Sequence, residues 1–459
     1  MISRLSLALF LWLALPAESI TFQHDDFIIL SGKIANVPVQ SNGKAQIELG
    51  APFGSGISTK VISLESDGSF TDTIRGRSGI YILTDEKNQV SLHLETSKRY
   101  TIAYDAKQFK RGPVVLSGAD TAINRYYVEK SQNRLFFDPT GNGKSELEWR
   151  QFIGGIKKDA LGRIKKSVLP PNLVAFEGKD TEYRYLFNLF LYLAYRELDD
   201  SAFKPSAASI KELNINYANE PDFKIYSSYC RLVTEHHFMR FNREGKKLGK
   251  GKKIFFFAST IENEAIRNVM IEEVAISELK AAEDINICYA EFRKYYNGNN
   301  AKLIEKLEDT YLRLGKLKKG TVSPAFTGYR NFDGGFNSLS DYKGRYVYID
   351  LWASWCGNCW NEMPYLKNLE TKYQGKNIVF LSISTDANIN DWEKTIAEQK
   401  LTGIQLLQTP SDKSFTSQYA VYGIPRYIFL DTEGKIIDYN APRPSDKEEL
   451  SELFGSVGL

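Results

Sequence analysis

The chain has 459 residues, of which 42% are hydrophobic and 25% are charged, a balance that excludes a largely disordered protein. Its formal net charge of +3 is small for this length and gives no reason to expect nucleic acid as a partner. The length exceeds what a single core usually supports and predicts about three domains.

The first residues have the pattern of a signal peptide. Arg4 precedes an apolar run over residues 5–15, and the small residues Ala17 and Ser19 follow it. We expect residues 1–19 to be removed and the mature protein to be soluble in the periplasm. The alternative is an N-terminal membrane anchor. The apolar run argues against it, because the run is shorter than the ~20 residues that span a bilayer.

Residues 24–118 are predicted to form an N-terminal antiparallel β-sandwich domain. Short runs of β-branched and aromatic residues follow one another closely, separated by turn signals such as Ser66-Asp67-Gly68. Short strands at this spacing are typical of small sandwiches. The predicted strands cover residues 27–34, 45–49, 60–64, 69–74, 79–83, 90–94 and 100–104.

Residues 119–317 change to helical periodicity and are predicted to form an all-α domain. Cys230 and Cys288 fall in predicted helices, so we expect buried thiols, with a bridge between them as the alternative. The four histidines are scattered along the sequence, and we expect neither a metal nor another cofactor. The predicted helices cover residues 182–195, 222–242, 259–279, 281–296 and 300–315.

Residues 318–459 form the predicted C-terminal domain, because strand and helix patterns alternate after a polar linker at 318–324. This alternation is typical of an α/β fold. The predicted strands cover residues 345–352, 377–383, 404–408, 426–430 and 434–438. The predicted helices cover residues 357–373, 389–400, 412–420 and 445–455.

Two of the four cysteines lie together in the segment Trp355-Cys356-Gly357-Asn358-Cys359. A buried-strand pattern at 346–352 precedes them, and helical spacing of apolar residues follows, so the thiols sit where a strand turns into a helix. A helix N-terminus offers free N–H groups and a partial positive charge, which favour a thiolate at Cys356. The sequence therefore predicts a redox site.

Further residues around this motif make the C-terminal domain resemble the thioredoxin superfamily. Asp350 lies six residues before Cys356, Pro364 lies eight residues after it, and Ile424-Pro425 directly precedes a strand pattern. The domain is most similar to exported thiol–disulfide oxidoreductases of the TlpA/ResA type, which include cytochrome c maturation reductases. This resemblance implies a central mixed sheet flanked by helices.

The resemblance also implies a catalytic role for each of these residues. An exposed Cys356 would attack a substrate disulfide as a thiolate, and Cys359 would resolve the mixed disulfide, leaving a redox-active Cys356–Cys359 disulfide. Asp350, buried beneath the pair, would accept the proton of Cys359, and burial raises a carboxyl pKa toward the value that suits this role. The alternative for Asp350 is a strand-end residue satisfied by a backbone donor. Pro364 would kink the active-site helix.

A substrate-binding edge is implied next to the thiols. A cis Pro425 would bring the backbone of Ile424 beside them, where an extended substrate can pair as a strand. Trp355 would flank the exposed sulfur, with plain packing as its alternative. Arg426 stands where the family usually has a small hydroxyl residue, and its guanidinium would either favour the Cys356 thiolate or point to solvent. Gly-Asn between the cysteines replaces the common Gly-Pro and leaves the redox potential open.

The sequence thus predicts an exported thiol–disulfide oxidoreductase that reduces protein disulfides. The resemblance implies disulfide-containing protein substrates and a membrane-embedded thiol electron donor. One alternative is a thiol peroxidase, although the cysteine turn lacks the Thr and Pro that a peroxidatic cysteine needs. Another is a binding or scaffold protein in which the upstream domains do the work. Those domains resemble N-terminal regions of Bacteroidetes-type thioredoxin-like proteins, which implies a role in choosing the partner.

Overall fold

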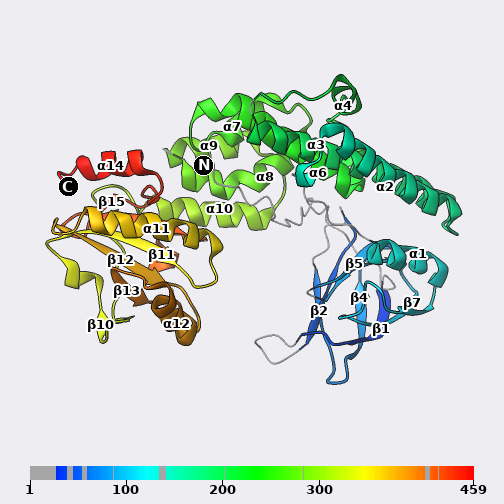
Figure 1. Cartoon of the computed structure of the whole chain (residues 1–459), viewed down its shortest axis with the longest axis horizontal. Coiled ribbons are helices and arrows are strands. Elements are labelled where there is room, and N and C mark those ends of the chain that lie inside the picture. Colours follow the sequence, from blue (N-terminus) through cyan, green and yellow to red (C-terminus); the bar gives the residue numbers. More distant parts are fainter. Residues whose placement is uncertain are drawn as a thin grey trace. The chain divides into compact units, whose positions relative to one another are not determined.

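The computed structural model describes residues 27–459 apart from 39–44, 54–58, 86, 134–140, 201, 283, 409–413 and 422. The predicted signal peptide therefore lies outside the described residues. The chain divides into two compact units, coloured along the sequence in Figure 1. The first unit contains the chain up to Gly249 together with Phe255–Glu273 and Tyr295–Asn300, and the second contains Lys250–Ile254, Val274–Lys294 and Ala301–Leu459.

The first unit begins with a β-sandwich of two four-stranded sheets, ordered β4-β1-β7-β8 and β3-β2-β5-β6. β1 pairs antiparallel with β4 but parallel with β7, where Ile29 lies opposite Arg99. The predicted sandwich is confirmed, and its antiparallel description is corrected at the β1–β7 pair. Alternation along a strand predicts which face is buried but not which strand lies alongside. The strands are β1 Phe27–Ala35, β2 Gln46–Gly50, β3 Lys60–Ser63, β4 Ser69–Arg75, β5 Gly79–Thr84, β6 Gln89–Leu94, β7 Arg99–Asp105 and β8 Val115–Gly118.

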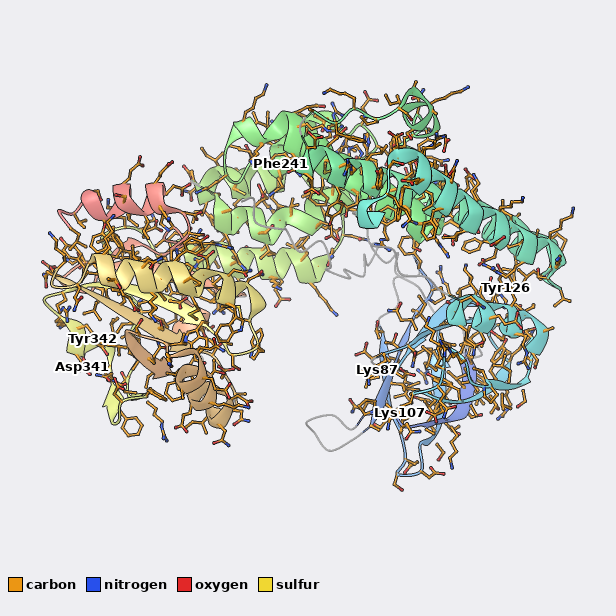
Figure 2. The ribbon with its side chains drawn as sticks, in the orientation of Figure 1. Lys87, Lys107, Tyr126, Phe241, Asp341 and Tyr342 are labelled. Carbon is orange, nitrogen blue, oxygen red and sulfur yellow. A yellow bond between two sulfur atoms is a disulfide. The ribbon has the colours of Figure 1, made fainter. Side chains whose placement is uncertain are left out.

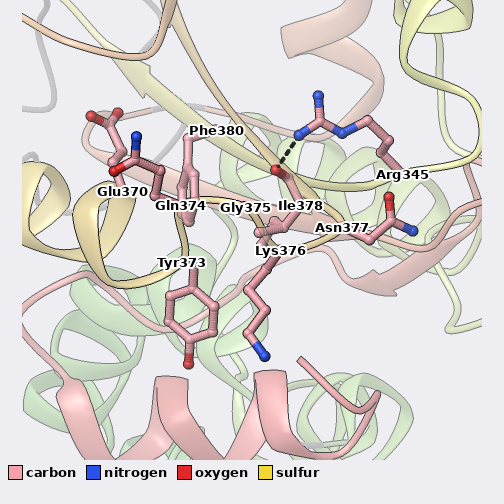
Figure 3. Close-up of a pocket in the computed structure, with 9 residues that line it drawn as sticks. All are labelled: Arg345, Glu370, Tyr373, Gln374, Gly375, Lys376, Asn377, Ile378 and Phe380. Atoms are coloured by element: carbon pink, nitrogen blue, oxygen red, sulfur yellow. Dashed lines mark hydrogen bonds between the residues drawn. The ribbon is translucent and has the colours of Figure 1, made fainter.

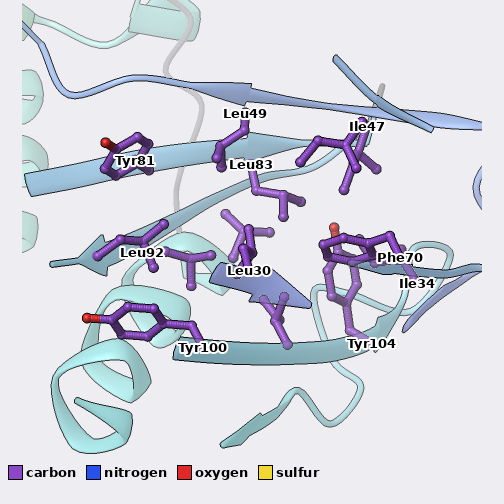
Figure 4. Close-up of a cluster of buried hydrophobic side chains, with 14 of the residues drawn as sticks. Leu30, Ile34, Ile47, Leu49, Phe70, Tyr81, Leu83, Leu92, Tyr100 and Tyr104 are labelled. Atoms are coloured by element: carbon purple, nitrogen blue, oxygen red, sulfur yellow. The ribbon is translucent and has the colours of Figure 1, made fainter. Parts of the chain in front are cut away.

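Side chains from both sheets meet in one apolar core (Figure 4). Leu30 from one sheet and Leu83 from the other have no exposed surface. Gly32 allows β1 to lie close to β7, because a Cβ atom at this position would lie 2.0 Å from the Ile102 carbonyl oxygen. The burial of apolar surface thus holds the two sheets together, and one glycine sets the spacing inside the first sheet.

A buried ionic cluster joins α1 (Thr121–Gln132) to α3 (Pro171–Asp199). The Glu177 carboxylate has no exposed surface and accepts hydrogen bonds from Lys130 Nζ at 2.6 Å and from the Tyr126 hydroxyl at 2.9 Å. Both donors lie on α1, where Tyr126 is labelled in Figure 2. Burying a carboxylate costs free energy unless it is paired or hydrogen-bonded, so these two bonds link α1 to α3.

Replacing Glu177 with glutamine should lower the free energy of unfolding by about 2 kcal/mol, because Lys130 loses its nearest anionic partner in a buried setting and keeps only the Asp180 carboxylate at 3.7 Å. Hydrogen exchange of the α1 and α3 amides would measure the loss. Glu182→Gln is the matched control, since Glu182 pairs with Lys157 at a half-exposed site, where a loss below about 0.5 kcal/mol is expected. Equal losses in the two variants would contradict the assigned importance of the buried cluster.

Helices make up the middle of the chain, as predicted, and the expected buried helix at 182–195 is the C-terminal part of α3. Cys230 and Cys288 are both buried and both free, so the predicted buried thiols are confirmed and the alternative bridge is wrong.

No helix in the described part of the chain is both long and apolar enough to cross a membrane. The remaining helices are α2 Glu146–Lys166, α4 Ala207–Glu212, α5 Glu220–Ile225, α6 Ser227–Arg240, α7 Lys253–Thr260, α8 Glu264–Ala281, α9 Ile285–Tyr295 and α10 Ala301–Leu314.

The second unit contains a seven-stranded mixed sheet in the order β10-β9-β13-β12-β11-β14-β15. β11, β12 and β13 are parallel, whereas β14 pairs antiparallel with β11. The predicted α/β fold with a central mixed sheet is confirmed, and β9 and β10 are additions that the sequence analysis did not predict. The strands are β9 Tyr329–Asn331, β10 Phe336–Asn337, β11 Tyr346–Trp352, β12 Ile378–Ser384, β13 Ile404–Leu407, β14 Arg426–Leu430 and β15 Ile436–Asp438.

Helices cover both faces of this sheet (Figure 1). One apolar cluster joins Tyr348 of β11 to Leu366 of α11 and Phe454 of α14. A second cluster joins Trp352, at the end of β11, to Trp392 of α12. A parallel strand buried on both faces needs apolar residues along most of its length, which is the pattern that β11 has. The helices are α11 Gly357–Lys372, α12 Ile389–Gln399, α13 Ser414–Gln418 and α14 Lys447–Gly455.

Candidate functional site: the cysteine pair at the start of α11

The two cysteines lie where β11 passes into α11. Cys356 is the N-cap residue of α11, and the backbone N–H of Cys359 donates a hydrogen bond to Cys356 Sγ at 3.1 Å. The two sulfurs are joined in a disulfide, with Cα atoms 5.3 Å apart. Because the Cys356 sulfur caps the helix start and accepts one of its N–H groups, this position favours negative charge on the sulfur once the disulfide is reduced.

Exposure differs sharply among the residues of this turn. Cys356 is 6% exposed and Cys359 is 1% exposed, so the expectation of an exposed Cys356 is wrong for the disulfide form. Both sulfurs belong to an apolar cluster with Trp352 and Trp392. Trp355, in contrast, is 71% exposed, which contradicts its alternative as a packing residue. The Trp355 ring therefore lies at the surface, next in sequence to a buried cysteine.

Asp350 is buried in the middle of the sheet, at 2% exposure, and its Oδ1 has no hydrogen-bond partner. Burial and, to a smaller extent, the nearby Glu362 and Glu370 carboxylates raise the pKa of this carboxyl to about 8, against the lowering effect of Ser382 and Tyr427 on the adjacent strands. The alternative of a carboxylate satisfied by a backbone donor does not fit an unpartnered oxygen. A carboxyl with a pKa raised in this way is able to take up and release a proton close to neutral pH.

Glu362 is a second buried carboxylate near the site, on α11, and the sequence analysis gave it no chemical role. Its oxygens accept hydrogen bonds from the backbone N–H of Ser445 at 3.0 Å and from the Ser445 hydroxyl at 2.9 Å. Its position three residues after Cys359, on the next turn of the same helix, was the available signal. Pro364 lies inside α11, as predicted.

The segment before β14 meets the cysteine cluster. The Ile424–Pro425 peptide bond is cis, as predicted, and the Ile424 side chain packs against the apolar cluster that contains both sulfurs. Arg426 neither points to solvent nor bonds a sulfur: its Nε and Nη2 donate to the Tyr439 carbonyl oxygen at 3.2 and 2.9 Å. Its guanidinium is engaged at the turn after β15, and a role of Arg426 in substrate binding stays a prediction.

Comparisons with known proteins bear on this domain. The Redoxin family matches residues 318–455. Thiol-disulfide oxidoreductase ResA of Bacillus thuringiensis subsp. konkukian is 29% identical over 146 residues, which are 31% of this chain and 80% of that protein. The C-terminal domain is a thioredoxin-like Redoxin domain.

Two solved structures are similar to this Redoxin domain. The thioredoxin domain of a thiol-disulfide oxidoreductase from Bacteroides vulgatus is 34% identical, with 31% of this chain and 98% of that chain covered and a TM-score of 0.28. A thiol:disulfide interchange protein from a Bacteroides species is 33% identical, with 30% of this chain and 90% of that chain covered and a TM-score of 0.28. The chain is a thiol–disulfide oxidoreductase of the ResA type in its Redoxin domain.

A cavity of about 560 Å³ opens where β11 and β12 begin, at the opposite end of these strands from the disulfide (Figure 3). Arg345 crosses it and donates to the Ile378 carbonyl oxygen at 2.7 Å. Since Cys356 follows the other end of β11, the cavity is remote from the disulfide, and none of the predicted site residues lines it. We assign it no part in the chemistry.

The sandwich contains a group of possible metal ligands that the scattered histidines gave no reason to expect. His93, Glu95 and Asp120 place ligand atoms within 4.8 Å of one another. The Lys98 ammonium, however, lies 2.6 Å from Glu95 and 3.0 Å from Asp120, so a cation already sits between the two carboxylates. This arrangement accounts for the cluster as an ion-pair network.

Proposed function

We propose that this protein is an exported thiol–disulfide oxidoreductase that reduces disulfide bonds in other proteins. The observation that carries the proposal is the Cys356–Cys359 disulfide at the N-terminus of α11, packed against Ile424 beside a cis peptide bond. Disulfide reduction needs an attacking thiol, a resolving thiol and a backbone segment along which the substrate can bind. Cys356, Cys359 and Ile424-Pro425 are proposed for these three roles.

The reaction begins with the reduced pair. The Cys356 thiolate attacks one sulfur of the substrate disulfide, and the other substrate sulfur leaves and takes up a proton from solvent. Cys359 then loses its proton and attacks the Cys356 sulfur, which releases the second substrate sulfur as a thiol once it is protonated. Two electrons pass to the substrate, and the protein is left as the Cys356–Cys359 disulfide. A membrane-embedded thiol donor would reduce it again.

Asp350 is proposed as the proton acceptor for Cys359. Its buried carboxyl, with a pKa raised to about 8 by burial and by Glu362, releases and regains a proton near the pH at which the enzyme works. The unpartnered Oδ1 leaves room for that proton. The groups proposed to receive the substrate are the exposed Trp355 ring and the Ile424-Pro425 backbone, along which an extended segment can pair.

The cellular setting is part of the same proposal. The apolar run at 5–15 supports export to the periplasm, and the resemblance to the ResA type supports the reductive direction and a role like that of cytochrome c maturation reductases. We propose domain boundaries at 24–118, 119–317 and 318–459, with the two upstream domains choosing the partner.

The direction of the reaction is tested by two assays on the full chain. It should accelerate reduction of insulin disulfides by a small dithiol about tenfold or more, and should accelerate oxidative refolding of reduced ribonuclease far less. The control is the reduced protein alkylated under native conditions, which blocks the Redoxin pair selectively because burial raises the pKa of the Cys230 and Cys288 thiols to about 12. Faster oxidation than reduction would reverse the proposed direction.

Export is tested separately, by fractionating the source cells and sequencing the mature N-terminus. Recovery in the periplasmic fraction with cleavage close to Ser19 is the expected result. Recovery of the full-length chain in the cytosol would contradict the localisation but leave the chemistry of the Redoxin domain untouched.

A further inference from the structure

The turn that leads into Cys356 is tied to a buried carboxylate that lies at the end of β12. Asp386 is 3% exposed, and its Oδ2 accepts a hydrogen bond from the Ser354 backbone N–H at 2.9 Å. Its Oδ1 accepts one from the Ser354 hydroxyl at 2.7 Å. Ser354 stands two residues before Cys356. The Asp386 carboxylate therefore binds both the main chain and the side chain of a residue in the turn that leads to Cys356.

The opposite side of Ser354 is held as well. Its carbonyl oxygen accepts a hydrogen bond from Trp360 Nε1, on the first turn of α11, at 3.1 Å. At the β12 end, the backbone N–H of Thr385 donates to the Trp352 carbonyl oxygen at 2.9 Å. The turn is thus fastened to β12 through Asp386 and to α11 through Trp360, which leaves Cys356 little freedom to move.

The Asp386 carboxylate is held by neutral donors. Besides the two groups of Ser354, the Ser384 hydroxyl donates to Oδ2 at 2.7 Å, and Ser384 Oγ in turn accepts the Asp386 backbone N–H at 3.0 Å. Among the ion pairs in the described part of the chain, none includes Asp386. Both oxygens of Asp386 accept hydrogen bonds, which is how a carboxylate anion is stabilised, and the field of such a buried group is weakly screened.

The sign of its effect on the cysteine pair follows from electrostatics. Reduction of the disulfide places negative charge on Cys356, at the end of the turn that Asp386 holds. A neighbouring anion raises the free energy of that thiolate and leaves the neutral disulfide unchanged. The reduced form is therefore the one that Asp386 disfavours, which makes the pair a stronger reductant.

We propose that Asp386 is a positioning residue for Cys356 whose negative charge shifts the redox equilibrium of the pair toward the disulfide. This inference rests on the dithiol chemistry proposed for Cys356 and Cys359. Through this charge, the cysteine pair would be a stronger reductant even though Gly-Asn replaces the common Gly-Pro between the cysteines.

The experiment is equilibration of the full chain with glutathione. Two reduced glutathione molecules and the protein disulfide give the protein dithiol and one oxidised glutathione, with two electrons and two protons transferred, and trapping the thiols gives the equilibrium constant. Asp386→Asn should shift this constant toward the dithiol about threefold or more. Ser384→Ala, which removes one donor from the carboxylate and leaves its charge less screened, should shift it toward the disulfide.

Asp431→Asn is the matched control. Asp431 also accepts backbone N–H groups, from Glu433 and Lys435, but it follows the end of β14 that pairs with the start of β11. No shift is expected there. A shift in Asp386→Asn no larger than that of the control, or one toward the disulfide, would overturn the inference. Should Asp386→Asn fail to fold, an unchanged constant in Ser384→Ala would overturn it instead. A wild-type pair that never equilibrates with glutathione would overturn the proposed function as well.

Discussion

Replacing Cys356 with serine should reduce the disulfide reductase activity of the full chain at least about 1000-fold. A serine hydroxyl at the N-cap can still accept the Cys359 N–H, so the helix start remains intact, but it is not ionised near neutral pH and cannot form the mixed disulfide. Insulin reduction with a small dithiol donor would measure the loss. Full activity in this variant would contradict the assigned attacking thiol.

Cys359→Ser should behave differently, because the attack by Cys356 survives and only its resolution is lost. The variant should accumulate a covalent complex with its substrate, visible as a higher-mass band that a reductant removes. Cys230→Ser and Cys288→Ser are the matched controls, since both thiols are buried and free and lie outside the turn. A Cys359→Ser chain that turns over normally would contradict the assignment of the resolving thiol. Trapped complexes recovered from the periplasm would also identify the substrates.

Asp350→Asn should stabilise the Redoxin domain by on the order of 3 kcal/mol at mildly alkaline pH. Burial raises the pKa of Asp350 to about 8, whereas an unfolded chain has the ordinary value near 3.8, so the folded state holds a proton that the unfolded state has lost between these two pH values. The stability of the wild type should therefore fall as pH rises from about 4 to about 8, by roughly 1.4 kcal/mol per pH unit at most. The variant should lack this slope.

Hydrogen exchange of the β11 and β12 amides, measured across that pH range, would report the stability of this domain alone. Asp391→Asn is the control, because Asp391 is exposed on the first turn of α12 and should change stability by less than about 1 kcal/mol. A wild-type stability that does not fall over the range would show that Asp350 is not a protonated buried acid. The variant should also resolve the mixed disulfide through Cys359 more slowly. A group that serves function often lowers stability, so removing it raises stability and lowers activity.

The sequence predicts the strand, turn and helix of the site because these depend on local pattern. The apolar run at 346–352 and the N-cap position of Cys356 follow from residues close together in the chain, whereas the cis bond before Arg426 was expected from the resemblance to the thioredoxin superfamily. β9 and β10 were missed because they are very short, with three and two residues, and because β9, to which β10 pairs, itself pairs with β13 about 75 residues away.

What the sequence did not reveal depends on contacts between distant residues. Arg426 reaches the Tyr439 carbonyl rather than the cysteines, and nothing in the pattern around residue 426 indicates that choice. The hydrogen bonds from Ser354 to Asp386 join residues 32 positions apart, across the ends of two parallel strands. Serine and aspartate are common at strand ends, so only the folded arrangement separates this pair from ordinary turn residues.

The exposure of Trp355 and the burial of Trp352 and Trp392 around the same disulfide have an optical consequence. A disulfide quenches the emission of nearby indoles. Trp352 and Trp392 lie in the cluster that contains both sulfurs, Trp360 packs against that cluster, and Trp355 is adjacent to Cys356 in sequence. We therefore expect the protein's own fluorescence to brighten when the bond is opened. The Redoxin domain carries a label-free indicator of its oxidation state, by which turnover can be followed in real time.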